Sequence, residues 1–196
     1  MGAEMRAALP LAVLLGAAAT ASCASSPPVQ FFALTVSDQP LQQRPAAPPS
    51  STPVRVAAVH IPAALDRQQI VRESAPGKVE ISDRHRWDAP LDQMVSNVLT
   101  QDLLRRLPRG AVVLPQEPAT PDTRAIVLDI LRFEPDAGGT VTLTGAWSLL
   151  PAASDTPLLT RRVALSEPAP ADYAGEVAAM SRLLGKLADE IAQALR

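Results

Sequence analysis

Two long runs of alternating residues, 124–133 and 140–149, constrain the fold of this chain more than any other feature. In the second run Thr140, Thr142 and Thr144 alternate with apolar or small residues, so one face is polar and the other can pack against a core. Residues 135–139, Pro-Asp-Ala-Gly-Gly, supply the turn that joins two antiparallel strands. The pattern predicts a β-hairpin, and residues 157–165 predict a third antiparallel strand.

Residues 91–107 change from an alternating pattern to the spacing of a helix. Their apolar side chains recur every three or four positions, as on the buried face of an amphipathic helix. Asp88 is expected to cap this helix and Pro90 to lie in its first turn, while Pro108 and Gly110 end it. The pattern predicts one helix with a single buried face.

A second helical pattern runs from about residue 172 to residue 195, with Asp172 as its cap. Spacings of three and four residues place its large apolar side chains on one stripe. The stripe consists of Val177, Met180, Leu184, Leu187, Ile191 and Leu195. We predict a long C-terminal helix that packs this stripe against the sheet.

Five shorter segments, rich in β-branched or aromatic residues, are also strand candidates. They are 30–36, 54–61, 68–72, 79–82 and 111–114. Residues 38–53 are dense in Pro, Gln, Ser and Ala and predict a loop inside the domain. Together these segments predict a single-domain α+β fold over residues 30–196: an antiparallel or mixed sheet with two helices packed on one face.

Cys23 is the only cysteine in the chain. No disulfide within the chain is possible, so the fold must be stable through its core alone. The cysteine follows an apolar run over residues 7–19, which has the length of a signal peptide's hydrophobic region and is too short to span a membrane as a helix. We therefore interpret residues 1–22 as a signal peptide, with translation from Met1 or from Met5.

The position of Cys23 resembles the lipobox of bacterial lipoproteins, in which the thiol receives a diacylglyceryl group, cleavage frees the amine, and the amine is acylated. Thr20 stands where that pattern usually has Leu, and an ordinary secretory signal that leaves a free thiol is the alternative. Ala24 replaces the Asp that resembles an inner-membrane retention signal. The resemblance implies an outer-membrane lipoprotein, anchored by lipid on Cys23, whose short tether of residues 24–29 holds a domain that faces the periplasm.

The sequence contains no recognisable catalytic or metal-binding motif. Its two histidines, His60 and His85, are not in a metal-ligand spacing, and no nucleophile elbow, phosphate loop or metalloprotease motif occurs. Asp129 is the one carboxylate that could be buried, although an outward position fits the alternation of its strand better. A formal net charge of −2 provides no positive electrostatic field that would attract nucleic acid. We expect no cofactor, no metal and no enzymatic activity.

Residues 84–87, Arg-His-Arg-Trp, place three potentially positive groups beside an indole, just before the first helix. Arg84, Arg86 and Trp87 are candidate contacts for a protein partner or a phospholipid headgroup, because Arg binds phosphate through two hydrogen bonds and Trp is common at interfaces. In the alternative interpretation, Trp87 covers the start of the helix while the arginines are solvated.

Three segments resemble the PqiC-like family of ABC-type transport auxiliary lipoproteins. Residues 65–71, Leu-Asp-Arg-Gln-Gln-Ile-Val, are similar to the family's Leu-Asp-Arg-Pro-Gln-Ile-Val, with Gln68 in place of Pro. Residues 86–91, Arg-Trp-Asp-Ala-Pro-Leu, are similar to its Arg-Trp followed by Pro-Leu at the start of a helix. Residues 31–34, Phe-Phe-Ala-Leu, resemble its paired Tyr before Leu. The order of elements agrees over essentially the whole mature chain.

The resemblance implies a partner of transport systems built on mammalian-cell-entry (MCE) domains, in which a periplasmic tunnel moves lipids between the two membranes. The lipoprotein is then expected to dock at the outer-membrane end of the tunnel as a ring-shaped homo-oligomer, to support lipid transport and envelope integrity, and not to hydrolyse ATP. Two other hypotheses stay open at this point: a chaperone or plug of an outer-membrane β-barrel, and a periplasmic hydrolase.

Overall fold

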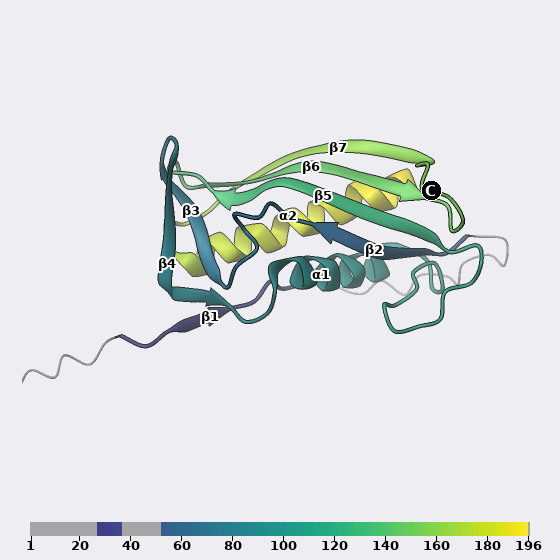
Figure 1. Cartoon of the computed structure of the whole chain (residues 1–196), viewed down its shortest axis with the longest axis horizontal. Coiled ribbons are helices and arrows are strands. Elements are labelled where there is room, and N and C mark those ends of the chain that lie inside the picture. Colours follow the sequence, from purple (N-terminus) through teal and green to yellow (C-terminus); the bar gives the residue numbers. More distant parts are fainter. Residues whose placement is uncertain (1–26, 37–51, 196) are drawn as a thin grey trace, which may run out of the picture.

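The computed structural model describes residues 27–36 and 52–195, and Figure 1 shows their arrangement. The expected signal peptide, Cys23 and almost all of the Pro-rich loop lie outside these residues. The strands in the described part of the chain are β1 (Gln30–Phe32), β2 (Val54–His60), β3 (Gln69–Ala75), β4 (Lys78–Trp87), β5 (Arg124–Pro135), β6 (Thr140–Leu150) and β7 (Leu159–Pro168). The helices are α1 (Leu91–Arg106) and α2 (Tyr173–Ala194).

The predicted hairpin and its third strand are confirmed as β5, β6 and β7, which pair antiparallel. With β2, which runs parallel to β5, they form a four-stranded sheet in the order β2-β5-β6-β7. Val141 and Leu143 face the core, as the alternation predicts. The turn is fixed by Asp136, whose Oδ1 accepts hydrogen bonds from the backbone N–H of Gly138 at 2.8 Å and of Thr140 at 2.9 Å.

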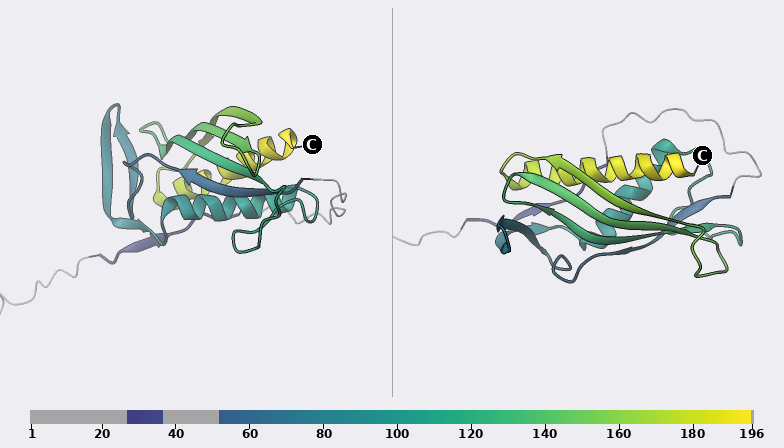
Figure 2. Two further views of the ribbon diagram at one scale, coloured as in Figure 1. Left: turned by 45° about the vertical axis from the view of Figure 1, so that its right-hand side comes forward. Right: turned by 90° about the horizontal axis from the view of Figure 1, so that it is seen from above.

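Both helices pack on the same face of this sheet (Figure 2). Helix α1 lies against β2, α2 lies against β6 and β7, and the two helices lie against each other. The predicted cap of α2 is confirmed, because Asp172 Oδ1 accepts from the backbone N–H of Gly175 at 2.7 Å. No helix in the described residues is long and apolar enough to cross a membrane.

The predicted cap of α1 is wrong. Pro90 is the N-cap residue and provides no side-chain hydrogen bond. Asp88 lies two positions earlier, and its backbone N–H donates to the carbonyl of Phe32 at 3.0 Å. This hydrogen bond ties Asp88 to β1 and separates it from the first turn of the helix.

The domain contains a second, three-stranded sheet in the order β1-β4-β3, where the sequence predicts only one sheet. Strands β3 and β4 form an antiparallel hairpin around Pro76 and Gly77, and β1 pairs parallel to the last residues of β4. Strand β4 bends after Ser82, whose Oγ accepts from the backbone N–H of His85 at 3.1 Å. Strand β3 and the part of β4 before the bend therefore project from one end of the domain (Figure 1).

Two predicted strands are shorter than expected. Residues 33–36 leave the sheet after Phe32, because Leu34 turns into the core and the backbone N–H of Thr35 donates to Ser181 Oγ of α2 at 3.1 Å. Residues 111–114 make only an isolated bridge, between Val112 and Val54. The first predicted strand is therefore reduced to Gln30–Phe32, and the second is a single bridge, which is too little for a strand.

Candidate functional site

The three segments that resemble the family are far apart in the sequence and meet in the small sheet. Phe31 is the register partner of Arg86, and Phe32 is that of Trp87. The backbone N–H of Trp87 donates to the carbonyl of Gln68 at 2.7 Å. The segments thus form one structural unit, and this unit at the end of the domain is the candidate functional site.

The apolar residues of these segments are part of the hydrophobic core. Leu65, Ile70 and Leu91 are buried. Trp87 is only 3% exposed, so its indole packs inside the domain and does not lie on the surface of the single chain. The polar residues stay outside: Arg84 is exposed, Arg86 is partly exposed, and Arg67 is exposed in the preceding segment. In the described chain only the arginines of the predicted contact set reach solvent, and their role as partner contacts stays a prediction.

A stack of aromatic and cationic side chains joins the β3–β4 hairpin to the start of α2. The His85 ring lies parallel to the Tyr173 ring, with 3.7 Å between the ring centroids. The guanidinium of Arg72 lies over the same Tyr173 ring, at 4.1 Å from its centroid. Arg72 also forms an ion pair with Glu176 at 3.2 Å. Because a cation over an aromatic ring and a partly buried ion pair both stabilise, this stack fixes the orientation of the hairpin.

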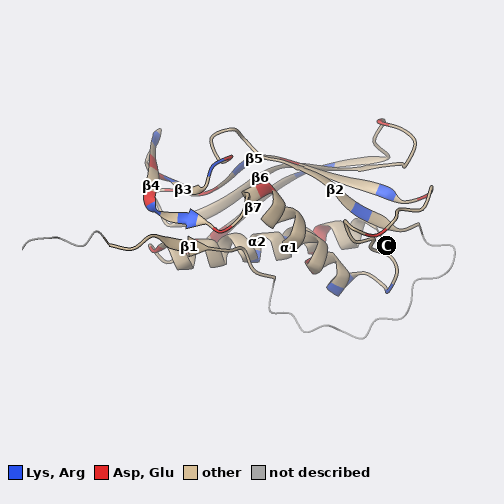
Figure 3. Cartoon of the chain, turned by 60° about the horizontal axis from the view of Figure 1, so that its bottom comes forward, with Lys and Arg blue, Asp and Glu red and all other residues tan. Residues whose placement is uncertain are grey.

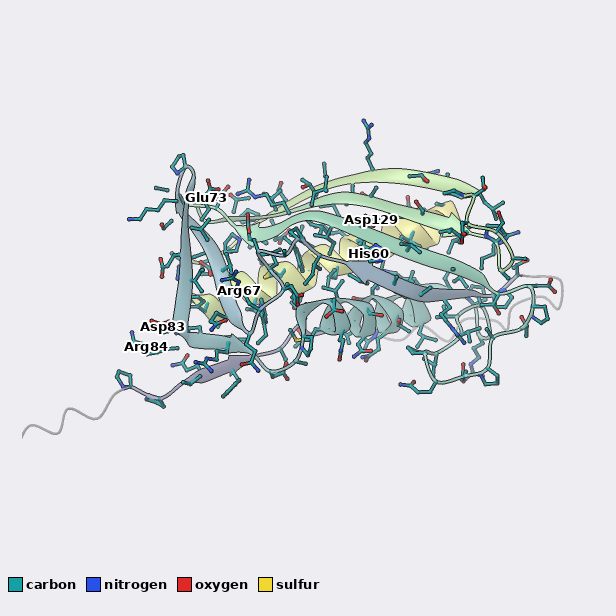
Figure 4. All side chains as sticks on the ribbon, in the orientation of Figure 1. His60, Arg67, Glu73, Asp83, Arg84 and Asp129 are labelled. Atoms are coloured by element: carbon teal, nitrogen blue, oxygen red, sulfur yellow. The ribbon has the colours of Figure 1, made fainter. Side chains whose placement is uncertain are left out.

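A second contact holds the hairpin on its other side. Arg132 of β5 forms an ion pair with Glu73 of β3 at 2.6 Å, and Figure 4 shows Glu73 near the tip of the hairpin. Asp83 and Arg84 point outward from the bend below it (Figure 4). The hairpin is thus held by α2 and β5, while its bend presents charged side chains to the surroundings.

The environment of His85 makes the site sensitive to pH. Burial lowers the pKa of His85 below its ordinary value, and the charges of Arg84 and Arg72 lower it further against the opposing charge of Glu80. The folded protein therefore favours neutral His85, whereas the unfolded chain takes up the proton as the pH falls below about 6.5. The stability that neutral His85 contributes is present above this pH and is lost as the pH falls.

We expect His85→Gln to weaken this pH dependence, because Gln can accept a hydrogen bond from Ser82 but does not titrate. The measurement is the free energy of unfolding of both proteins between about pH 7.5 and pH 5.5. The wild type is expected to lose more stability than the variant across that interval. Parallel curves would show that His85 is not the group responsible.

His60 and Asp129 form a pair that the sequence does not predict. His60 Nδ1 and Asp129 Oδ1 are 2.7 Å apart, on neighbouring strands β2 and β5, and both side chains are largely exposed (Figure 4). The outward position of Asp129 agrees with the alternation of its strand. The parallel pairing of β2 with β5 brings them together, so no spacing in the sequence could have indicated the pair. Within residues 27–36 and 52–195, no hydroxyl hydrogen-bonds to the pair, and there is no cluster of three metal-ligating side chains.

A cavity of about 640 Å³ lies at the opposite end of the four-stranded sheet. Arg55, Arg124 and Leu150 are among the residues that line it. Arg124 is the register partner of Val54, the residue before Arg55, and Figure 3 shows basic positions close together near this end of β2. Arg55 donates a hydrogen bond to the backbone carbonyl of Glu117. This hydrogen bond holds the loop that precedes β5 beside the cavity. No pattern in the sequence indicates this cavity, because its lining comes from three segments that are far apart in the chain.

The sequence matches the family described as ABC-type transport auxiliary lipoprotein component over residues 32–192. The chain belongs to this family. The match includes both central segments and every helix and strand after the first, so the resemblance noted in the sequence is confirmed. The family is an auxiliary component of ABC-type transport and consists of lipoproteins, which agrees with a membrane-anchored chain.

Solved structures confirm the fold of this auxiliary lipoprotein. A crystal structure of an uncharacterized protein superposes with a TM-score of 0.70 at 20% identity and covers 87% of this chain and 100% of its own. Protein XCC0632 from Xanthomonas campestris superposes with a TM-score of 0.65 at 19% identity, over 85% of this chain and 95% of its own. The search of curated proteins gives no match. At these identities the similarity concerns the fold alone.

Proposed function

We propose that this auxiliary lipoprotein is the outer-membrane component of an MCE-type ABC transport system. In this proposal the lipid on Cys23 anchors it to the inner face of the outer membrane. Its domain docks at the end of the periplasmic tunnel, as a homo-oligomer, and supports lipid transport between the membranes and envelope integrity. The family match over residues 32–192 is the observation that carries the proposal.

The shape of the domain is consistent with a docking platform. The described chain starts at β1, at the end with the β3–β4 hairpin, and α2 finishes at the opposite end (Figure 1). Val29 lies six positions after Cys23, and six extended residues span at most about 20 Å. A lipid on Cys23 therefore keeps the small sheet near the membrane and leaves the other end, with its loops and cavity, further from it.

The proposal predicts which proteins the lipoprotein binds. The wild-type protein, purified from membranes with mild detergent, is expected to recover an MCE-domain protein, and deletion of its gene is expected to disturb the lipid balance of the outer membrane. A matched preparation of His60→Gln is expected to recover the same partner, because the proposal assigns the exposed His60–Asp129 pair no role in docking.

Other outcomes of this experiment would contradict the proposal. Recovery of an outer-membrane β-barrel in place of an MCE-domain protein would favour the chaperone or plug hypothesis. Loss of function in a folded His60→Gln or Asp129→Asn variant would favour a periplasmic hydrolase. Recovery of no transport protein, together with an undisturbed lipid balance, would refute a transport role.

A further inference from the structure

An aromatic side chain is exposed next to the point where the domain begins. Phe31 is 62% exposed and Val29 is 41% exposed. Side chains two positions apart in an extended segment point to the same side, so Val29 and Phe31 form one apolar strip. Pro27 and Pro28 precede them and have no N–H with which to extend the strand. The chain therefore leaves the sheet immediately before this strip.

Basic side chains border the apolar strip. Arg86 is the register partner of Phe31. Arg84, at the bend of β4 (Figure 4), comes one position before His85, the register partner of Gln30, just as Val29 comes one position before Gln30. Neither arginine has a carboxylate within 4.0 Å among the described residues, although Asp83 adjoins Arg84 in the chain. The Nε atom of Arg86 is shielded from solvent and has no hydrogen-bond partner there. This atom is out of reach of an anion, but Arg84 is exposed and Arg86 is partly exposed, so both side chains reach solvent, where an anion can bind.

We propose that this strip, Val29 and Phe31 together with Arg84 and Arg86, lies in the headgroup layer of the membrane that carries the lipid anchor. The inference rests on the proposed lipidation of Cys23. An aromatic side chain enters the boundary between headgroups and acyl chains, and guanidinium groups bind lipid phosphates in two-pronged geometry. Anionic lipids attract each basic residue near the surface. The short chain from Cys23 places the strip within reach of that layer.

This contact has a consequence for orientation. A lipid anchor alone leaves a domain free to rotate above the membrane. A second contact through the small sheet turns the β3–β4 end toward the lipids. The opposite end, which carries the loop 151–158 and the cavity, then faces away from the membrane.

Tryptophan fluorescence can test the contact in the lipidated protein. The native Trp87 and Trp147 are both buried, so they give a background that is shielded from lipid. We expect Phe31→Trp, in vesicles of phosphatidylethanolamine and phosphatidylglycerol, to add blue-shifted emission that lipids brominated on their acyl chains largely quench. Leu158→Trp is the matched control, because Leu158 is similarly exposed but lies at the opposite end, and its emission should stay unquenched.

Charge variants and neutral lipids provide the second measurement. Replacing Arg84 and Arg86 by Gln in the Phe31→Trp protein, or using phosphatidylcholine alone, is expected to remove most of the quenching, since each basic residue near an anionic surface changes the binding constant about fivefold. Equal quenching of Phe31→Trp and Leu158→Trp would overturn the inference. Iodide, which quenches tryptophan from the aqueous side, gives a further check. If neither brominated lipid nor iodide quenches the Phe31→Trp emission, a second protein chain covers position 31 and the inference is overturned.

Mass spectrometry of Cys23 distinguishes a failure of the proposed lipid anchor from a failure of the proposed headgroup contact. A chain without acyl groups on Cys23 would refute the anchoring in the proposed function. A lipidated chain in which the Phe31→Trp emission is unaffected by brominated lipid would refute the headgroup contact alone.

Discussion

Arg106→Met is expected to lower the free energy of unfolding by about 3–5 kcal/mol, the usual cost of removing one partner of a buried ion pair. Arg106 lies between the two helices, where its Nη1 contacts Asp102 Oδ1 at 2.8 Å and its Nε contacts Asp189 Oδ1 of α2 at 2.8 Å. Asp102 is fully buried. Burial lowers the pKa of Arg106, but the hydrogen bond to Asp189 and the charge of Asp102 raise it more, so it stays charged.

Chemical denaturation of the purified protein measures this cost, and Arg182→Met is the matched control. Arg182 pairs with Glu167 at 2.7 Å but is 48% exposed, so its loss should cost no more than about 1 kcal/mol. If the cost of Arg106→Met comes from the charge left on Asp102, the double variant Asp102→Leu/Arg106→Met should recover part of it. Equal effects of Arg106→Met and Arg182→Met would contradict a special role for the interhelical ion pairs.

The helix interface matters for the candidate site because α2 carries Tyr173 and Glu176. Both residues contact Arg72 of the β3–β4 hairpin. A shift of α2 against α1 would therefore move the stack that orients the hairpin. Stability in the core and the geometry of the exposed end are linked through this helix.

The sequence predicted the elements whose pattern is local. The β5–β6 hairpin follows from alternation and a turn rich in Gly, and α2 follows from its stripe and from Asp172. Both signals act between residues close together in the chain, so one sequence contains all the information needed. The α+β class and the two helices on one face of a sheet are confirmed for the same reason.

The sequence could not predict features that depend on contacts between distant segments. The second sheet requires β1 to pair with the end of β4, and the bend at Ser82 has no signature in the residue pattern. The burial of Trp87 depends on where β4 turns. The pair of His60 with Asp129 and that of Arg106 with Asp189 join residues from different elements, which only the fold brings together.

Cys23→Ser is expected to release nearly all of the protein from membranes into the soluble fraction. Serine is close to cysteine in size but has no thiol to accept a diacylglyceryl group, so the lipid anchor cannot form. Each buried methylene of an acyl chain contributes about 0.8 kcal/mol, and several chains together make the anchor stable. Fractionation of cells and incorporation of labelled palmitate measure the two effects.

The membrane contact through Phe31 should be too weak to keep the Cys23→Ser protein on the membrane. A single myristoyl chain alone gives only marginal, reversible membrane binding, and Val29 and Phe31 together bury less apolar surface than such a chain. The strip can therefore orient an anchored domain but cannot hold an unanchored one. Thr20→Leu is the control, because it introduces the residue usual in the lipobox and should leave the protein lipidated and membrane-bound. If Cys23→Ser stayed on the membrane and the wild type took up no palmitate, Cys23 could not be the anchor.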